Sequence, residues 1–286
     1  GVRHFLRRFT ADEMRQRTAQ TIELLDEPFA DPSILPVSML CEFARERVTV
    51  ALAGDGGDEL FAGYDPFRAV RAADWYRRWV PDWLHQRVFR PATRWLPASS
   101  RNMSLQFKVS RFLRGAGVHP RLRCATWMGA MDLEQLGRLA PALASAWPVE
   151  RAYGPVLAAY DKLEAMDADT LDQALHFFQR FYLVDDILVK VDRASMMHSL
   201  EVRSPFLDTR LVEYVNSLPH GLKLRGGVTK YLLKQSLLHG DGHGPIVHAR
   251  SHSEDGIAEG LVLFDAGPAY AVLARDAPFH GLPQRL

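Results

Sequence analysis

Apolar residues follow two different patterns along the chain, and the first predicts a buried strand. The run VTVALA at residues 48–53 is short, β-branched and apolar throughout, as expected for a strand buried on both faces of a parallel sheet. A short helix is expected before it, over about residues 37–47, and the segment GDGGDELFAGY at residues 54–64 follows it. Strand, glycine turn and helix, in this order, form the ligand-binding end of a parallel strand in α/β folds. We therefore expect a ligand site directly after residue 53.

An irregular loop is predicted before this unit. The segment LLDEPFADPSILP at residues 24–36 contains three prolines, and each disfavours helix at the residue before it. We expect the helix to begin only after Pro36.

The second pattern is helical and extends from residue 65 to about residue 183. Trp75, Trp79 and Trp83 recur every four residues, which favours a row of indoles packed against a neighbouring helix; a membrane or partner surface is the alternative. The segment at residues 171–183 has one apolar face, formed by Leu171, Ala174, Leu175, Phe178, Phe181 and Tyr182.

Composition narrows the class of protein. The 286 residues, 47% hydrophobic and 24% charged, argue against disorder, collagen-like repeats and a coiled-coil rod, and the length allows about two domains. Thirty-five basic residues against thirty-four acidic ones leave a net charge of +1, which gives no bulk electrostatic reason to expect nucleic acid as a partner. Phosphate chemistry would therefore need a local site.

Compartment and processing signals point to a cytoplasmic protein. Cys41 and Cys124 are far apart and have no metal-ligand spacing, which argues against a disulfide framework or structural zinc. No apolar run approaches the length of a transmembrane helix. There is no initiator methionine and no signal peptide, so we expect the chain to begin inside a domain.

The segment GDGGDE at residues 54–59 could bind a phosphate. Its glycines allow positive φ and can direct successive N–H groups at an anion. Asp55, Asp58 and Glu59 would repel phosphate unless a cation intervened, and Mg²⁺ is the ion that usually bridges carboxylates and phosphates. On local pattern alone, a glycine-rich surface turn with solvated acids is favoured over this interpretation.

A second block dense in charge occupies residues 184–237. Its charged residues include Asp185, Asp186, Lys190, Asp192, Arg193, Glu201, Arg203, Asp208, Arg210 and Lys230. Beyond Lys234 there is no further lysine, and the histidines there show no metal-ligand spacing.

Five segments, in order, carry a resemblance to a known family. They are DEPFADPSILP, VTVALAGDGGDELFAGY, DDILVKVDRASM, HSLEVRSPFLD and LKLRGGVTKYLL. Up to about residue 238 the chain closely resembles the synthetase domain of glutamine-hydrolysing asparagine synthetases. The resemblance implies an α/β fold of the ATP-pyrophosphatase (adenine nucleotide α-hydrolase-like) type, a parallel sheet flanked by helices with a mostly helical C-terminal half. It also implies a reaction in which a carboxylate attacks the α-phosphate of Mg-ATP, pyrophosphate leaves, and ammonia converts the acyl-adenylate to an amide and AMP.

The resemblance implies roles for residues of the glycine loop and for one lysine. Asp58 resembles the Mg²⁺-binding acid, and Asp55 resembles an acid that faces nucleotide or substrate. Lys230 resembles the lysine that neutralises charge at the α-phosphate and pyrophosphate. Ala53 stands where many relatives have Ser. The nucleotide-binding turn would be formed by Gly54, Gly56 and Gly57.

Two roles are possible for the other charged residues in the five matching segments. They could orient substrate and phosphates, or form an internal ion-pair network that fixes the segment VRSPFLD against the sheet. Asp26 and Glu27 are expected to order their loop rather than to act in catalysis. The residues with both roles open are Asp192 and Arg193, as nucleotide-binding candidates, and Glu201 and Arg203, as catalytic candidates.

The resemblance also divides the chain. Residues 1–64 would be the remainder of the nucleotide-binding core without its SGGxDS loop, residues 65–238 the mostly helical part, and residues 239–286 a divergent tail. Neither that loop nor a glutaminase domain is present, so the 286 residues alone are expected to show little or no synthesis.

The expected function is therefore part of an ATP- and Mg²⁺-dependent asparagine synthetase that adenylates aspartate and transfers ammonia from glutamine. Its expected partners are aspartate or a similar carboxylate and ammonia from a glutaminase domain outside this chain, without nucleic acid or membrane; a homodimer is left open. One alternative is amidation of another carboxylate in a β-lactam, peptide or polysaccharide pathway. Another is a non-catalytic binding module.

Overall fold

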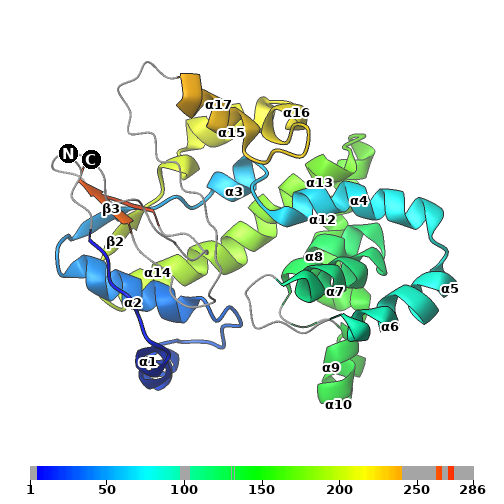
Figure 1. Cartoon of the computed structure of the whole chain (residues 1–286), viewed down its shortest axis with the longest axis horizontal. Coiled ribbons are helices and arrows are strands. Elements are labelled where there is room, and N and C mark those ends of the chain that lie inside the picture. The colour runs from blue at the N-terminus through cyan, green and yellow to red at the C-terminus, as the bar shows by residue number, and fades with distance from the viewer. Residues whose placement is uncertain are drawn as a thin grey trace. The chain divides into compact units, whose positions relative to one another are not determined.

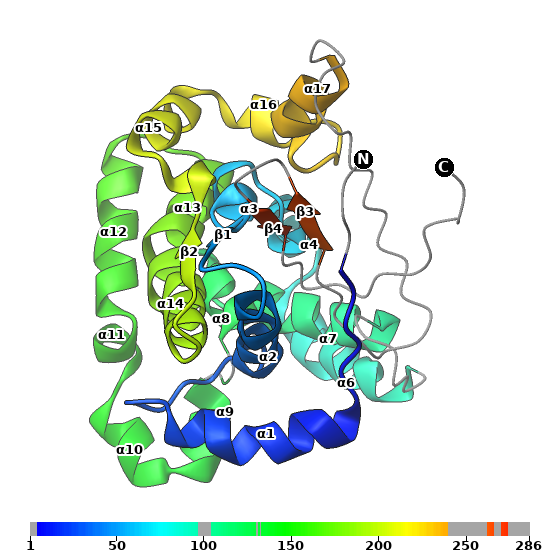
Figure 2. The same ribbon diagram turned by 90° about the vertical axis from the view of Figure 1, so that its left-hand side faces the viewer.

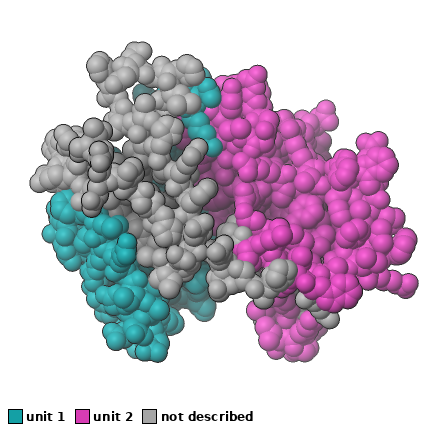
Figure 3. All heavy atoms as spheres, in the orientation of Figure 1, with its two compact units in different colours: residues 1–57, 184–217, 234–286 teal, residues 58–183, 218–233 magenta. Residues whose placement is uncertain are grey.

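The computed structural model describes residues 5–96, 104–129, 131, 133–239, 262–265 and 270–273. The chain divides into two compact units (Figure 3). Unit 1 comprises residues 1–57, 184–217 and 234–286, and unit 2 comprises residues 58–183 and 218–233. Each unit is thus built from segments that are distant in the sequence.

Unit 1 contains a four-stranded sheet with the strand order β2-β1-β4-β3. The central strand β1 (Val50–Leu52) is parallel to β2 (Glu201–Arg203) and to β4 (Tyr270–Leu273), whereas β3 (Val262–Asp265) is antiparallel to β4. A strand within residues 48–53 is therefore confirmed, although it is shorter than predicted. Of the predicted tail, residues 240–261, 266–269 and 274–286 lie outside the described residues.

Helices cover this sheet. Helix α1 (Ala11–Glu23) begins with a capping box, in which the Thr10 N–H donates to Glu13 Oε2 (2.7 Å) and the Glu13 N–H donates to Thr10 Oγ1 (3.2 Å). Helix α2 (Ile34–Arg45) packs against α14 (Val189–Met196), and α15 (Thr209–Ser217) follows the 3₁₀ turn η5 (Pro205–Leu207) (Figures 1 and 2). A small apolar core includes Phe43, Ala51 and Leu200.

The predicted start of α2 was too late. The helix begins at Ile34, so that Pro36 lies inside its first turn. A proline is tolerated there because the N–H groups of the first turn have no intrahelical acceptor in any case.

Unit 2 is helical, as predicted for residues 65–183. Its elements are α4 (Asp65–Trp79), α5 (Asp82–Leu84), the π-helix η1 (His85–Phe89), α6 (Arg90–Ala92), η2 (Thr93–Trp95), α7 (Leu105–Ala116), η3 (Pro120–Leu122), α8 (Arg123–Met128), α9 (Leu133–Leu139), α10 (Pro141–Ala146), α11 (Val149–Ala152), α12 (Gly154–Ala165), α13 (Thr170–Phe177) and α16 (His220–Lys223). The short α3 (Gly57–Leu60), the π-helix η4 (Phe178–Leu188) and α17 (Tyr231–His239) cross between the segments of the two units. The protein is therefore α/β, mostly helical, with a small sheet in which β1 is parallel to both neighbours.

The predicted apolar face of residues 171–183 is confirmed. Leu171, Ala174, Leu175 and Phe178 are buried in the core of unit 2, and Phe181 and Tyr182 pack against it. Phe177, which the 3.6-residue period left off this face, is buried as well. The reason is that α13 passes at this point into η4, whose wider π-helical turns shift the positions that face the core.

The predicted packing of the tryptophan row is wrong. The side chains of Trp75, Trp79 and Trp83 are 68%, 66% and 62% exposed. Helix α4 instead buries the face that carries Phe67, Val70 and Ala73, which is turned away from the indoles. The four-residue period predicted that the tryptophans share one side of a helix, but it did not determine whether that side is buried or exposed.

Both cysteines are free and buried, Cys41 in unit 1 and Cys124 in unit 2. Burial raises the pKa of each thiol to about 12, and for Cys41 the charge of Asp55 adds to this effect. Because the thiolate is the reactive form, we expect neither cysteine to react with Ellman's reagent in the folded chain at pH 8 and both to react after denaturation. Rapid labelling of either thiol in the native protein would contradict this burial.

None of the helices in the described part of the chain is long and apolar enough to cross a membrane.

Candidate active site

The glycine loop follows β1 and packs against η5 within unit 1. The Ala53 N–H donates to the Arg203 carbonyl (2.8 Å), and the Gly57 N–H closes a turn on the Gly54 carbonyl (3.2 Å). Gly56 has a φ of +88°, and a Cβ at this position would overlap the Leu207 side chain. Glycine is therefore required at residue 56 both by the backbone conformation and by the close approach of η5.

The Asp55 side chain, in the same loop, contacts the segment HSLEVRSPFLD through Ser204. Ser204, immediately before η5, donates a hydrogen bond from its hydroxyl to Asp55 Oδ2 (3.1 Å). This bond fixes the orientation of the carboxylate at the carboxyl end of β1, the end at which parallel strands present ligand-binding loops.

Unit 2 brings Asp58 and Lys230 together across 171 intervening residues. The Lys230 ammonium lies 2.9 Å from Asp58 Oδ1, with side chains that are 17% and 34% exposed. The Lys230 backbone has a φ of +52°, which is uncommon for a residue with a side chain, and its N–H donates to the Phe61 carbonyl (3.0 Å). Backbone strain of this kind persists where the surroundings hold it, often at functional sites.

Gly63 is a further residue of this site, and sequence reasoning assigned it no role. Its N–H donates to the Asp58 carbonyl (2.7 Å). A Cβ at Gly63 would overlap Asp58 Oδ1 and lie 2.5 Å from Lys230 Cε. The ion pair thus needs a glycine at residue 63, and the signal was its place in the segment LFAGY, five residues after Asp58.

Glu59 does not share the environment of its neighbour Asp58. Its side chain is buried, and the Tyr64 hydroxyl donates to Oε1 (2.6 Å). Burial and the charges of Glu59 and Asp58 raise the pKa of Tyr64 far above its ordinary value, so this hydroxyl remains a neutral donor. Glu59 therefore belongs to the interior of unit 2, where the Tyr64 ring stacks on Phe178 at 5.2 Å.

The four charged candidates of the second block do not form one group. Arg193 Nη2 lies 3.0 Å from Asp26 Oδ1 and 2.8 Å from Glu27 Oε1, which ties α14 to the proline-rich loop. Arg203 Nε instead donates to Glu201 Oε1 (2.7 Å), two residues earlier on the same face of β2. Asp192 is exposed. Among the described residues, then, Arg193 with its two acids and the pair of Glu201 and Arg203 are two separate groups rather than one network.

The Arg193 guanidinium also has a nitrogen that contacts neither of these acids. Its Nη1 is buried and has no hydrogen-bond acceptor among the described residues. A buried N–H without an acceptor is costly, so this guanidinium could receive an anionic oxygen in addition to its two carboxylate partners.

Lys190 is the most deeply buried cation of unit 1 that the sequence singled out. Its ammonium contacts Asp31 Oδ2 (2.7 Å) and Ser33 Oγ (2.8 Å), and its side chain is 5% exposed. Burial by itself raises the pKa of Asp31, but hydrogen bonds from Lys190 and Ser33, together with the lysine charge, outweigh it and lower that pKa. Lys190 therefore joins α14 to the start of α2 and has a structural role in unit 1.

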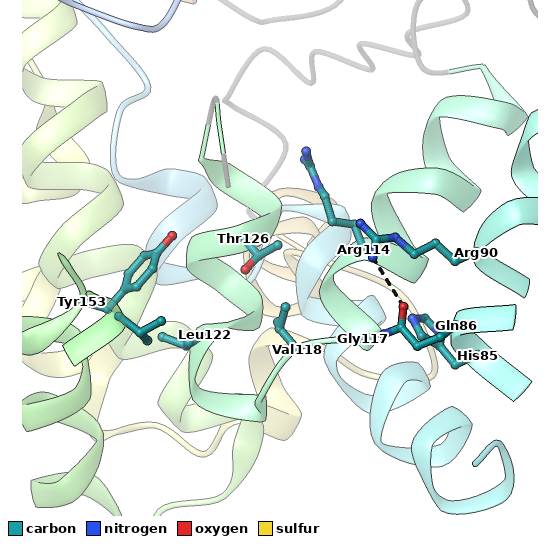
Figure 4. A pocket seen from close by; sticks show the side chains of 10 residues that line it. His85, Gln86, Arg90, Arg114, Gly117, Val118, Leu122, Thr126 and Tyr153 are labelled. Atoms are coloured by element: carbon teal, nitrogen blue, oxygen red, sulfur yellow. Dashed lines mark hydrogen bonds between the residues drawn. The ribbon is translucent and has the colours of Figure 1, made fainter. Parts of the chain in front are cut away.

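Unit 2 also contains a pocket of about 220 Å³ away from these residues (Figure 4). Arg90 and Gln86 both line this pocket, and Arg90 donates a hydrogen bond from Nη1 to Gln86 Oε1 (3.4 Å). The residues that line it are His85, Gln86, Arg90, Arg114, Gly117, Val118, Leu122, Thr126, Val149 and Tyr153. None of them was a candidate from the sequence.

One group of metal-ligating side chains occurs among the described residues, around His220 in unit 2. Its Nδ1 lies 3.2 Å from Asp172 and its Nε2 lies 3.3 Å from Asp169. Arg71 Nη2 is 3.0 Å from the same Nε2. Because the guanidinium stands where a metal ion would approach Nε2, the group is best explained as a cluster of hydrogen-bonded side chains that includes Arg71.

Comparison with known proteins identifies the family of this chain. The family model for asparagine synthase matches residues 1–239, and the chain belongs to this family, as the resemblance predicted.

Three curated relatives illustrate the match. A putative glutamine-hydrolysing asparagine synthetase of Mycobacterium tuberculosis is 32% identical over 240 residues, which cover 83% of this chain and 34% of that protein. Asparagine synthetase 1 of Bacillus subtilis is 27% identical over 82% of this chain and 35% of its own length. The amidase chyE of Penicillium rubens is 28% identical over 63% of this chain and 27% of its own length. The chain thus spans about a third of the length of the first two relatives, and no solved structure matches it significantly.

Proposed function

We propose that this chain is part of an ATP-dependent amide-forming enzyme that adenylates aspartate and transfers ammonia from glutamine to give asparagine, AMP and pyrophosphate. The observation that carries the proposal is the contact between Lys230 and Asp58, two residues singled out for this chemistry from separate segments, which lie 2.9 Å apart in unit 2. Membership of the asparagine synthase family supports the reaction class.

Lys230 would stabilise negative charge during adenylation. Attack of a carboxylate on the α-phosphate increases charge on the non-bridging oxygens and on the departing pyrophosphate. The ammonium is held by Asp58 on a side chain that is 17% exposed, and the Lys230 backbone N–H donates to the Phe61 carbonyl, so little reorganisation is needed when this charge develops. Lys230 would thus act on the transition state more than on the bound substrate.

The residues present fit a magnesium ion that arrives with the nucleotide. The contact with Lys230 uses Asp58 Oδ1, and Oδ2 belongs to the same carboxylate, which is one-third exposed. Protein-bound Mg²⁺ commonly takes only one or two carboxylates and completes its shell with phosphates and water. Bound Mg²⁺ would offset phosphate charge, and Asp58 would hold it at the end of the glycine loop.

The remaining site residues are proposed to position the reactants. Gly54, Gly56 and Gly57 would form the nucleotide-binding turn, which the hydrogen bond from the Gly57 N–H to the Gly54 carbonyl closes, and Asp55 would face the nucleotide or the substrate amine from its position beside Ser204. For Arg193, the buried Nη1 favours contact with an anion in addition to loop ordering. The exposed pair of Glu201 and Arg203 would contact the carboxylate substrate. The ATP-pyrophosphatase fold, ammonia from a glutaminase domain, a homodimer and a cytoplasmic location belong to the same proposal.

A second candidate function is the same ATP-dependent amide formation with a carboxylate other than aspartate as the substrate. Relatives of this chain include proteins named amidases in Penicillium rubens and in Gibberella zeae, alongside the asparagine synthetases. No residue described here selects aspartate over another carboxylate.

The proposal is tested by ATP–pyrophosphate exchange with the full product of the gene, measured across a panel of carboxylates. We expect exchange that depends on Mg²⁺ and is fastest with aspartate, and little or none from the 286 residues alone. Fastest exchange with another carboxylate would select the second candidate. Absence of any ATP binding by the full product would identify a non-catalytic module and overturn the proposal.

A further inference from the structure

The near-zero net charge of the chain conceals a strongly basic segment. Residues 61–129 contain thirteen lysines and arginines, three aspartates and no glutamate, an excess of ten positive charges in a chain whose net charge is +1. All of these residues belong to unit 2. A basic segment of this kind favours an anionic partner.

The three aspartates of the segment are already engaged with basic side chains. Asp74 pairs with the buried Arg123 and Asp82 with Arg77. Asp65 lies 3.8 Å from both Arg68 and Lys108. Arg78 and Arg87, by contrast, are exposed and form no ion pair with any residue that the structure describes. Positive charge therefore remains on the surface.

The exposed indoles lie on this basic surface. Trp75, Trp79 and Trp83 follow one another at four-residue intervals along α4 and α5, which form the outer helices of the segment (Figure 1). Arg71 and Arg78 are exposed on the same side of α4. We call the surface formed by these five residues the Trp–Arg face.

The core of unit 2 does not explain the indoles. Helix α4 makes its core contacts through Phe67, Val70 and Ala73, and the tryptophans remain more than 60% exposed. Adjacent large aromatic side chains on a surface mark an interaction site more often than single exposed apolar residues do.

We propose that the Trp–Arg face docks on the surface of an anionic lipid bilayer. Indoles partition to the boundary between headgroups and acyl chains, and arginines bind anionic headgroups. The described helices are too short and too polar to span a bilayer, so the attachment is peripheral. The inference concerns a different surface from Lys230 and Asp58 and does not depend on the proposed function.

Charge and geometry favour a bilayer over two other partners. A symmetric dimer through this face would place Arg71 and Arg78 of one copy against the same residues of the other, with no unpaired described acid of the segment to neutralise them. Single-stranded nucleic acid is usually bound in a groove that follows its backbone. Here Trp75 and Trp79 lie one turn apart on α4, and Trp83 lies on the next helix, α5, beyond the extended residues Val80 and Pro81, so the exposed indoles are spread over two helices.

The test is sedimentation of the 286-residue chain with lipid vesicles. We expect binding to vesicles of phosphatidylglycerol and phosphatidylcholine, little binding to pure phosphatidylcholine, and weakening as salt is raised. Replacing Trp75, Trp79 and Trp83 together with alanine should reduce the affinity about tenfold or more. Trp147→Ala is the matched control, because Trp147 is an exposed tryptophan of unit 2 outside the basic segment.

Because the three indoles are exposed, the triple variant is expected to unfold at the same temperature as the parent chain, which circular dichroism can verify. Arg78→Gln with Arg87→Gln should lower the salt dependence while leaving the fold intact. Equal binding to both kinds of vesicle, or an unchanged affinity of the triple variant, would overturn the proposal. So would a dimer that the triple variant dissociates, or tighter binding to polyuridylate than to the anionic vesicles.

Discussion

Lys230→Ala is expected to lower ATP–pyrophosphate exchange by the full product of the gene about a thousandfold, because the variant lacks the cation that we propose stabilises the developing phosphate charge. Asp58→Asn should cause a loss of similar size, since it removes both the partner of Lys230 and the proposed magnesium ligand. The exchange rate at saturating ATP is the measurement.

Stability should change little in these variants, which separates catalysis from folding. The pair is partly exposed, and pairs of this kind contribute at most about 1 kcal/mol to the free energy of unfolding. Lys162→Ala, at an exposed lysine of α12, is the matched control and should retain full exchange. Near-normal exchange in Lys230→Ala would remove this residue from the proposed chemistry.

Gly63→Ala provides an independent test that leaves every charge in place. The added Cβ would force Asp58 and Lys230 apart, so exchange should fall although both side chains remain. Full activity in this variant would show that the contact between them is dispensable.

Lys190→Ala is expected to destabilise unit 1 by about 3–5 kcal/mol, the cost of breaking a buried ion pair and leaving one charge without its partner. The ammonium is almost fully buried, and its removal leaves Asp31 in a half-buried environment with only Ser33 as a donor. Urea unfolding followed by circular dichroism measures the change, and Lys162→Ala again serves as the control. A loss below about 1 kcal/mol would place the pair with ordinary surface ion pairs.

The same pair predicts a pH dependence. The pKa of Asp31 is lower in the folded protein than in the unfolded chain, so its contribution to stability is fully present above the unfolded value of about 3.9 and is lost as the pH falls through the lower folded value. In Lys190→Ala this contribution is absent. The difference in unfolding free energy between the parent and the variant should therefore shrink as the pH is lowered below about 4. A difference that is equal at pH 7 and pH 3 would contradict the assignment.

Local pattern was sufficient for several features of the fold. The apolar run at residues 48–53 yields β1, and the period of residues 171–183 identifies the face that α13 buries. These predictions succeed because strand and helix periods are properties of the local backbone. Strand β2 was not predicted, since it is only three residues long and is defined by its pairing with β1 across about 150 residues.

The resemblance of five ordered segments also identified the family, and it singled out Asp58 and Lys230, whose roles stay predictions. Only the tertiary structure decided which side chains meet. It paired Asp58 with Lys230, made Gly63 necessary, and buried Glu59 beside Tyr64 although Glu59 is adjacent to Asp58. It also left the tryptophan row exposed, because the direction of an amphipathic face depends on what the rest of the chain packs against it. The sequence by itself thus determined the family and the candidate residues, and long-range packing determined which side chains these residues contact.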